Sequence, residues 1–251
     1  MIKPRWWHSI LIVIAWIAVF KYSTLSGILL MTPPARAFLY AIWTMIFVGP
    51  YIYFVEKKDI LSGIGLGKER VKKNLHWTLF FVFFAGATLI LSSSYFRPTG
   101  TEFNQFSDIP YYALFLGPFI VSGLAFEVLY RGFLMERLLE RGFVFSLIVM
   151  VALFTVHNIP AYMRLYTDIA RSLAILAFVS VMFGVIYYYS RNIVGLFLIH
   201  GAIDATPALI NYFGPWGPVI LGIAFMIIGF PFVVKLHPSE YGQKRISDSA
   251  L

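Results

Sequence analysis

The sequence predicts an all-α protein, built as a polytopic membrane bundle of about eight transmembrane helices with a polar cavity open toward the cytoplasm. Of its 251 residues, 59% are hydrophobic and only 13% are charged, and the mean hydropathy is +0.78. This composition excludes an ordinary soluble domain. The apolar residues also gather into long runs, and a helix needs about 20 such residues to cross a bilayer. A few ionisable side chains interrupt these runs, and they predict the cavity.

The predicted spans follow one another along the chain without repeats or low-complexity segments. Residues 1–251 are therefore expected to form a single transmembrane domain. The first apolar run is expected to remain as a span, because it lacks the small-residue cleavage site of a signal peptide. The eight runs cover residues 7–29, 36–55, 76–95, 111–135, 143–160, 172–189, 192–212 and 216–235.

The distribution of basic residues predicts the orientation. Of 20 lysines and arginines, fourteen lie in segments that are inside if the N-terminus is cytoplasmic, four lie outside and two lie within spans. This asymmetry favours cytoplasmic termini, in the plasma (inner) membrane of a prokaryote. Residues 56–75 are expected to be a cytoplasmic interfacial segment lying along anionic lipid. Residues 238–251 are expected to be a loosely ordered cytoplasmic tail.

Composition also excludes several kinds of site and partner. The chain has no cysteine, which excludes disulfides, thiolate catalysis and cysteine-ligated zinc. Its net charge of +8 does not indicate nucleic acid, because the basic residues lie in short connections and are not interleaved with aromatic residues along a groove. The expected partners are membrane lipid and a membrane-associated substrate.

After the loops and the outermost residues of each span are set aside, six ionisable residues remain within the predicted spans. Each charge at mid-membrane costs at least ~2.5–3.5 kcal/mol on insertion scales, so such residues either pair for structure or mark a functional site. Lys21 is expected to snorkel or to line a polar gap. The six residues are Lys21, Glu127, Arg131, His157, His200 and Asp204.

Glu127 and Arg131 lie four residues apart in the stretch FEVLYRGFL, residues 126–134. They therefore share a helix face and can form an ion pair. The pair is either a buried salt bridge that orients the helix or the support of a functional carboxylate. Gly132 allows close approach of a neighbouring helix. Glu136 and Arg137 are expected to form a solvated helix end.

His200 and Asp204 repeat the four-residue spacing in the stretch HGAID. A carboxylate at that spacing can fix the histidine tautomer, whether the imidazole serves as base, oxyanion donor or metal ligand. A histidine satisfied by a neighbouring helix is the alternative. His157 precedes Pro160, which is expected to stop or kink the helix, so by itself it predicts a polar helix end facing water. Together, Glu127, His157 and His200 predict one shared cavity.

These residues resemble the CPBP family of intramembrane proteases, which includes CAAX prenyl endopeptidases and bacteriocin-immunity (Abi) proteins. The family signature is Glu-Glu-x-x-x-Arg, then Phe-x-x-x-His, then His-x-x-x-Asn or Asp. Glu127 and Arg131 match the first motif and His157 matches the second. His200 and Asp204 match the third. The resemblance covers roughly residues 110–215, the expected catalytic core.

The chain departs from the family at Phe126, where the signature has its first glutamate. Phenylalanine cannot accept a proton. Either Glu127 takes over that role or the chain is an inactive relative. Adjacent helix residues point ~100° apart, so a handover to Glu127 requires the helix to rotate or shift.

The resemblance implies an intramembrane endopeptidase that cleaves near the end of a membrane-associated peptide or lipid-modified protein. In this reading Glu127 and His157 activate water, His200 held by Asp204 stabilises the oxyanion, and Arg131 supports Glu127. No cofactor is required, or zinc binds the two histidines and a carboxylate. The alternatives are a catalytically impaired binding, scaffold or immunity protein and, third, a small transporter.

Overall fold

The structure is a computed structural model that describes residues 5–25, 33–73, 75, 78–79, 118–165 and 169–204. Within these ranges the chain is helical and contains no β-strand, which confirms the all-α fold class. The predicted spans 76–95 and 216–235 and the predicted tail lie largely or wholly outside the described residues. The eight-span count therefore stays a prediction.

The helices of the described chain follow the predicted apolar runs. One of them, Phe38–Val55, is long and apolar enough to cross a membrane, judged by length and composition. Three more apolar helical stretches are shorter: Trp6–Val19, Phe143–Asn158 and Leu176–Ser190. The elements are α1 (Trp6–Leu25), α2 (Pro33–Pro50), the π-helix η2 (Tyr51–Val55), α3 (Ile60–Gly63), α4 (Lys68–Lys73), α7 (Pro118–Glu127), the π-helix η4 (Val128–Met135), α8 (Glu136–Leu138), the 3₁₀ turn η5 (Leu139–Arg141), α9 (Phe143–Leu165), α10 (Ile169–Ser190) and α11 (Ile193–Asp204).

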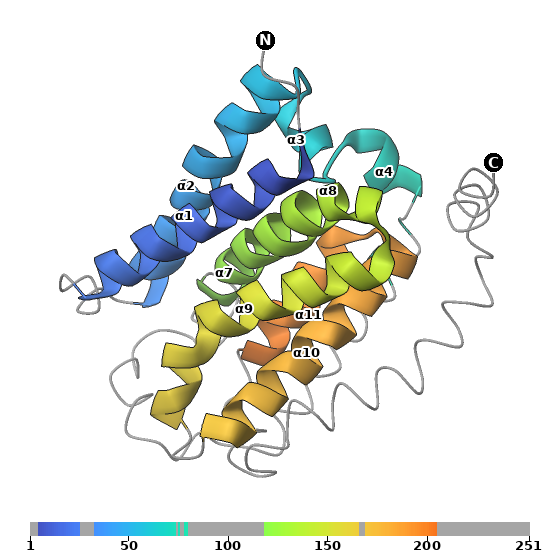
Figure 1. Ribbon diagram of the computed structural model, residues 1–251. Helices are drawn as coiled ribbons and strands as arrows, with labels where there is room; N and C mark the ends of the chain where they lie inside the picture. Colours follow the sequence, from blue (N-terminus) through green and yellow to red (C-terminus); the bar gives the residue numbers. More distant parts are fainter. Residues whose placement is uncertain are drawn as a thin grey trace, which may run out of the picture.

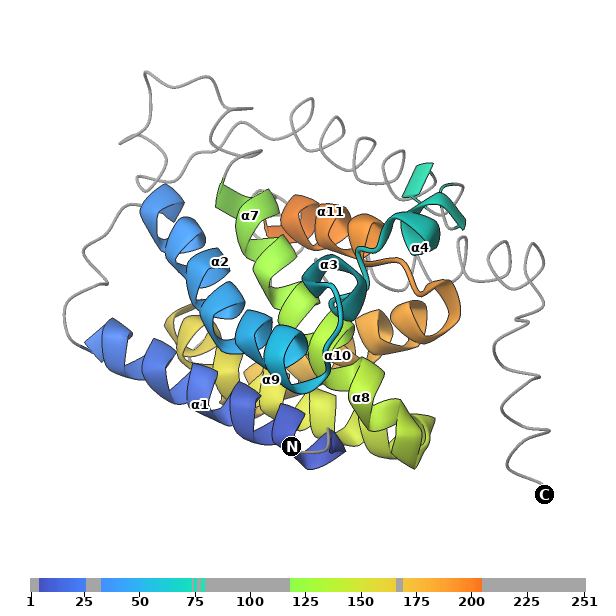
Figure 2. The same ribbon diagram turned by 90° about the horizontal axis from the view of Figure 1, so that it is seen from above.

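A central helix, α7 continued by η4 and α8, organises the bundle. Figures 1 and 2 show it between α1 and α2 on one side and α10 and α11 on the other, with α9 alongside. Many of its apolar residues are fully buried, among them Leu129, Phe133 and Leu134. This central position explains why residues 127–135 are buried on all sides.

Large apolar side chains cover the outer faces of the bundle. On α2, Phe38, Ile42 and Ile46 recur every four residues and are 51–61% exposed. On α9, Val144 and Ile148 are exposed at the same spacing. A bundle whose outer helices present such stripes while its central helix buries a glutamate and an arginine has the pattern expected in a lipid environment.

The α7–α11 contact is close because glycines meet there. A Cβ built on Gly123 would lie 2.8 Å from the Phe197 carbonyl oxygen and 3.2 Å from the Gly201 nitrogen. Gly132 likewise has no room for a side chain, but its neighbours are the backbone of Ile64 and the side chain of Ile193. The close approach predicted at Gly132 is therefore made mainly to the turn after α3.

The segment 56–75 folds onto one end of the bundle. Asp59 caps α3 by accepting a hydrogen bond from the Ser62 amide (2.9 Å). Ile64 is buried beneath it, and Figure 2 shows α3 lying over the central helix. Contact of this segment with lipid stays a prediction.

Candidate functional site

The central helix brings two ionisable residues into the buried interior, and neighbouring helices add two more. Glu127 ends α7 and Arg131 lies in η4, and both side chains are 0% exposed. His157 of α9 and His200 of α11 are 3% and 7% exposed. All four were predicted as site residues from the sequence, and all four are buried.

Glu127 connects two of these residues through one oxygen. Its Oε1 accepts a hydrogen bond from Arg131 Nη1 at 3.0 Å, as the four-residue spacing predicts. The same oxygen lies 2.7 Å from His200 Nδ1. Since an ionised carboxylate only accepts hydrogen bonds, Nδ1 carries the proton in this contact. The Gly123–Gly201 approach of α7 and α11 makes this short contact possible.

The helix changes its geometry directly after Glu127. Residues Val128–Met135 form a π-helix, in which hydrogen bonds join residues five apart and each turn holds more residues than in an α-helix. The π-helix therefore rotates the side chains that precede Val128 relative to those that follow Met135. In a continuous α-helix the two groups would point in other relative directions. This rotation is a shift of the kind that a handover from position 126 to Glu127 requires.

Phe126 lies against both histidines. Its ring centroid is 5.1 Å from that of His157 and 5.9 Å from that of His200, with the latter pair stacked. Trp16 of α1 adds a second edge contact to His157 at 4.9 Å. The two histidines thus share one aromatic neighbour, the residue that precedes Glu127.

The interpretation of His157 as a polar helix end facing water is wrong. Helix α9 continues past Pro160 to Leu165, so the proline does not end it, and His157 is buried. A proline inside a membrane helix is tolerated because neighbouring groups can satisfy the freed backbone. Ala161, Tyr162 and Met163 also extend the apolar run beyond the proline.

For two of the predicted residues, the structure describes the backbone only. Asp204 is the last residue of α11, and Lys21 lies in α1, but both side chains lie outside the described residues. Support of His200 by Asp204 therefore stays a prediction. The described partner of His200 Nδ1 is Glu127.

Zinc binding stays a prediction, because the side chain of Asp204 lies outside the described residues. Among the described side chains, no three histidine, aspartate or glutamate residues are grouped closely enough to hold a metal ion.

Several further contacts in the buried cluster were not predicted from the sequence. Tyr130 is fully buried and stacks on His157, with ring centroids 5.9 Å apart. The Arg131 guanidinium packs over the rings of Phe154 and Phe183, at 4.8 and 5.5 Å. The aromatic residues of this region could be counted from the sequence, but no spacing rule pointed to these contacts.

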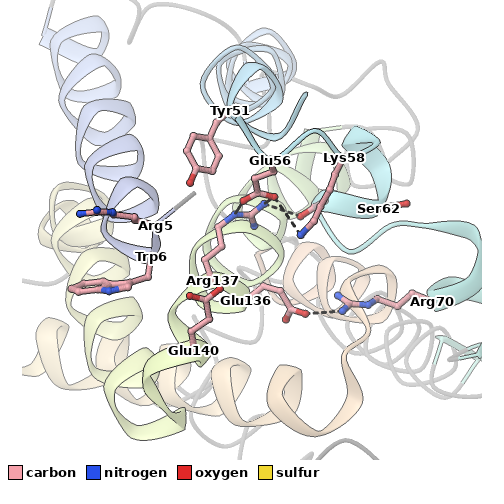
Figure 3. A pocket seen from close by; sticks show the side chains of 11 residues that line it. Arg5, Trp6, Tyr51, Glu56, Lys58, Ser62, Arg70, Glu136, Arg137 and Glu140 are labelled. Atoms are coloured by element: carbon pink, nitrogen blue, oxygen red, sulfur yellow. Dashed lines mark hydrogen bonds and ion pairs between the residues drawn. The ribbon is translucent and has the colours of Figure 1, made fainter. Parts of the chain in front are cut away.

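A polar cavity of about 480 Å³ lies at the end of the bundle where α3 and α4 fold. None of the predicted site residues lines it. Figure 3 shows that several of its charged side chains form pairs along the cavity wall. Arg137 donates to both oxygens of Glu56 at 2.6 and 2.8 Å, and Arg70 donates to Glu136 at 2.6 Å.

The expectation that Glu136 and Arg137 form a solvated helix end is therefore wrong. Glu136 also accepts hydrogen bonds from Arg191 at 2.6 Å and from the Tyr187 hydroxyl at 3.0 Å. Burial raises the pKa of Glu136, but Arg191 and Arg70 outweigh it and hold the pKa below its ordinary value. The hydrogen bonds and ion pairs of Glu136 connect α4 to α8 and to the end of α10.

Residues 108–206 match the family model described as type II CAAX prenyl endopeptidase Rce1-like. The match runs through Glu127, Arg131, His157, His200 and Asp204, and it confirms the resemblance inferred from the three motifs. No curated protein matches the chain. No solved structure matches it either.

Proposed function

We propose that this chain, which is similar to the CAAX prenyl endopeptidase Rce1-like family over residues 108–206, is an intramembrane endopeptidase. It is a CAAX-protease-like membrane protein, and its substrate would be a membrane-associated peptide or lipid-modified protein cut near its end. The observation that carries the proposal is the buried Glu127 carboxylate, which Arg131 and His200 hold through one oxygen.

The two oxygens of the Glu127 carboxylate differ in their hydrogen bonding, and this difference suits a general base. Oε1 is engaged twice, whereas Oε2 is buried and has no hydrogen-bond partner among the described residues. In the proposed reaction, Oε2 takes a proton from water while the water oxygen attacks the peptide carbonyl carbon. When the carbon–nitrogen bond breaks, the same proton passes to the leaving amine. The proton taken from water is the one that the leaving amine receives, so these steps involve no metal or cofactor.

The neighbouring side chains would assist this step. Arg131 and His200 hold the carboxylate in place by their contacts with Oε1. His157 would orient the water together with Glu127; its burial and its contact with the ring of Phe126 support this role. A base held this rigidly needs little reorganisation during the reaction.

The proposed setting is a plasma membrane of prokaryotic type, with eight spans and both termini cytoplasmic. The exposed apolar stripes on α2 and α9 support burial of the bundle in lipid. A lipid-facing bundle would receive its substrate laterally from the bilayer. The bias of basic residues toward one side supports the orientation.

A cleavage assay tests the proposal. Purified protein in lipid nanodiscs would be given membrane-anchored peptides with varied C-termini, beside Glu127→Gln, His157→Ala and His200→Ala. Loss of the base is expected to lower the rate by about 10²–10⁴-fold. Glu69→Gln on exposed α4 is the control and should cleave at the wild-type rate. Cleavage that survives Glu127→Gln refutes the assignment of the base, and metal analysis of the same sample tests for zinc.

A second candidate function is peptide binding without cleavage, and the position of Phe126 favours it. Its ring contacts both histidines, where it would hinder a substrate carbonyl from reaching them. In this case the wild-type protein would bind the peptides but cut none of them. Binding that Glu127→Gln leaves unchanged, with no cleavage by any variant, would support the binding protein over the enzyme.

A further inference from the structure

Tyr130 carries a buried hydroxyl that is not hydrogen-bonded to any described residue. The side chain is 0% exposed in η4. Buried polar groups normally have partners, and each exception requires a reason. A phenylalanine would fill the same space without burying an unpaired hydroxyl.

The hydroxyl belongs to a residue that packs within the Glu127–histidine cluster. Its ring stacks on His157 with an interplanar angle of 18° and meets Phe154 edge-on at 5.2 Å. Tyr130 also precedes Arg131, which holds Glu127. The unpaired donor therefore lies among the residues to which we assign the chemistry.

Two groups of this cluster have the hydrogen-bonding character that peptide hydrolysis needs: an acceptor for the attacking water and a donor for the carbonyl oxygen. Among the described residues, Glu127 Oε2 is an acceptor without a hydrogen-bond partner and the Tyr130 hydroxyl is a donor without one. An attacking water donates to a carboxylate, whereas the peptide carbonyl oxygen becomes negatively charged and needs donors. A substrate would satisfy both groups at once.

Two nitrogens of Arg131, Nε and Nη2, also have no hydrogen-bond partner in the part of the chain that the structure describes. Its guanidinium is packed over the rings of Phe154 and Phe183, while Nη1 is bonded to Glu127. These contacts commit Arg131 to holding the carboxylate. The Tyr130 hydroxyl is a donor of this cluster that makes no hydrogen bond among the described residues.

We propose that Tyr130 is a catalytic residue whose hydroxyl donates a hydrogen bond to the carbonyl oxygen of the scissile peptide bond. The inference rests on the proposed endopeptidase function. The hydroxyl keeps its proton throughout and stabilises the oxyanion that forms when water attacks. It thereby supplies a donor that does not depend on His200.

Tyr130→Phe in the full-length protein in nanodiscs tests the proposal. Removal of one such donor lowers kcat by about 10²–10³-fold in other hydrolases, and the same loss is expected here with KM nearly unchanged. The melting temperature should be equal to or above that of the wild type, because an unpaired buried hydroxyl has been removed. A misfolded variant would show a lowered melting temperature instead.

Tyr187→Phe is the matched control, because its hydroxyl already donates to Glu136 at 3.0 Å. It should lower the melting temperature and leave kcat unchanged. If Tyr130→Phe cleaves at the wild-type rate while Glu127→Gln is inactive, the Tyr130 proposal is overturned and the endopeptidase stands. If the wild type cleaves no peptide, the endopeptidase is refuted and the role of Tyr130 falls with it.

Discussion

Glu127 Oε1 and His200 Nδ1 lie 2.7 Å apart and join α7 to α11 inside the bundle. The same oxygen accepts a hydrogen bond from Arg131. A buried carboxylate shared between a guanidinium and an imidazole is well compensated for its desolvation, because both partners donate to it. Stability and the proposed chemistry therefore depend on the same three side chains, and variants must separate the two effects.

Glu127→Ala should be strongly destabilising. It leaves the Arg131 charge buried without its carboxylate, and removal of one partner of a buried pair costs about 3–5 kcal/mol. The free energy of unfolding can be measured by titration with SDS in mixed micelles. The double variant Glu127→Leu/Arg131→Met removes both charges and should recover much of this loss while remaining inactive. Equal stability of the single and double variants would show that the pair is not coupled.

Gly123→Ala should weaken the α7–α11 contact and, through it, the proposed catalysis. The added methyl would lie 2.8 Å from the Phe197 carbonyl oxygen, so the helices must separate and the Glu127–His200 contact must lengthen. Gly49→Ala in α2 is the control, since its Cβ would meet only Ile60 at 3.8 Å. The control should be neutral or slightly stabilising, because alanine favours a helix by about 1 kcal/mol over glycine.

Thermal unfolding and peptide cleavage of the two glycine variants provide the check. Gly123→Ala is expected to lose both stability and activity relative to Gly49→Ala. If the two variants behave alike, the close approach of α7 and α11 does not determine the position of Glu127.

The sequence was most informative where partners are close along the chain. The Glu127–Arg131 pair follows from one turn of helix, and the apolar runs place α9 and α10 within about five residues of their observed ends. The burial of Glu127 follows from its position within an apolar run. Local spacing and composition are sufficient for these features.

Partners far apart in the chain could not be predicted. Glu136 binds Arg70 and Arg191, which are 66 and 55 residues away, so it looked like a solvated helix end. The unpaired hydroxyl of Tyr130 depends on which side chains surround it in three dimensions. The π-helix after Glu127 likewise has no local signal in the sequence.

The stability of the protein should fall in acid because of Glu136. Its pKa in the folded state lies below the ordinary value of 4.5, since Arg191 and Arg70 outweigh the effect of burial. A lowered pKa stabilises the fold above the unfolded pKa. That contribution is lost as the pH falls from about 4.5 through the folded pKa.

Melting temperatures measured between pH 7 and pH 3 would check this expectation. Glu136→Gln should be less stable than the wild type at neutral pH and should lose less stability in acid. Glu140→Gln, an exposed neighbour in the same cavity wall, is the matched control. It should follow the wild-type profile, and a flat wild-type profile would contradict the assignment.

Phe126→Glu should raise the cleavage rate. The Phe126 ring contacts His157 and His200, so a carboxylate at this position would lie beside both imidazoles. It would supply a second proton acceptor at the place where the family signature has its first glutamate, and a general base contributes about 10²–10⁴-fold. Removal of the ring would also free the space between the histidines for a substrate carbonyl.

Phe126→Gln distinguishes these two causes, because glutamine has the size of glutamate but cannot act as a base. If the carboxylate is responsible, only Phe126→Glu gains activity, and the gain should disappear when His157→Ala is added. If the freed space is responsible, both variants gain equally. A Phe126→Glu protein that keeps the wild-type melting temperature but shows no gain would mean that position 126 does not reach the reacting bond, and Glu127 would then remain the sole candidate base.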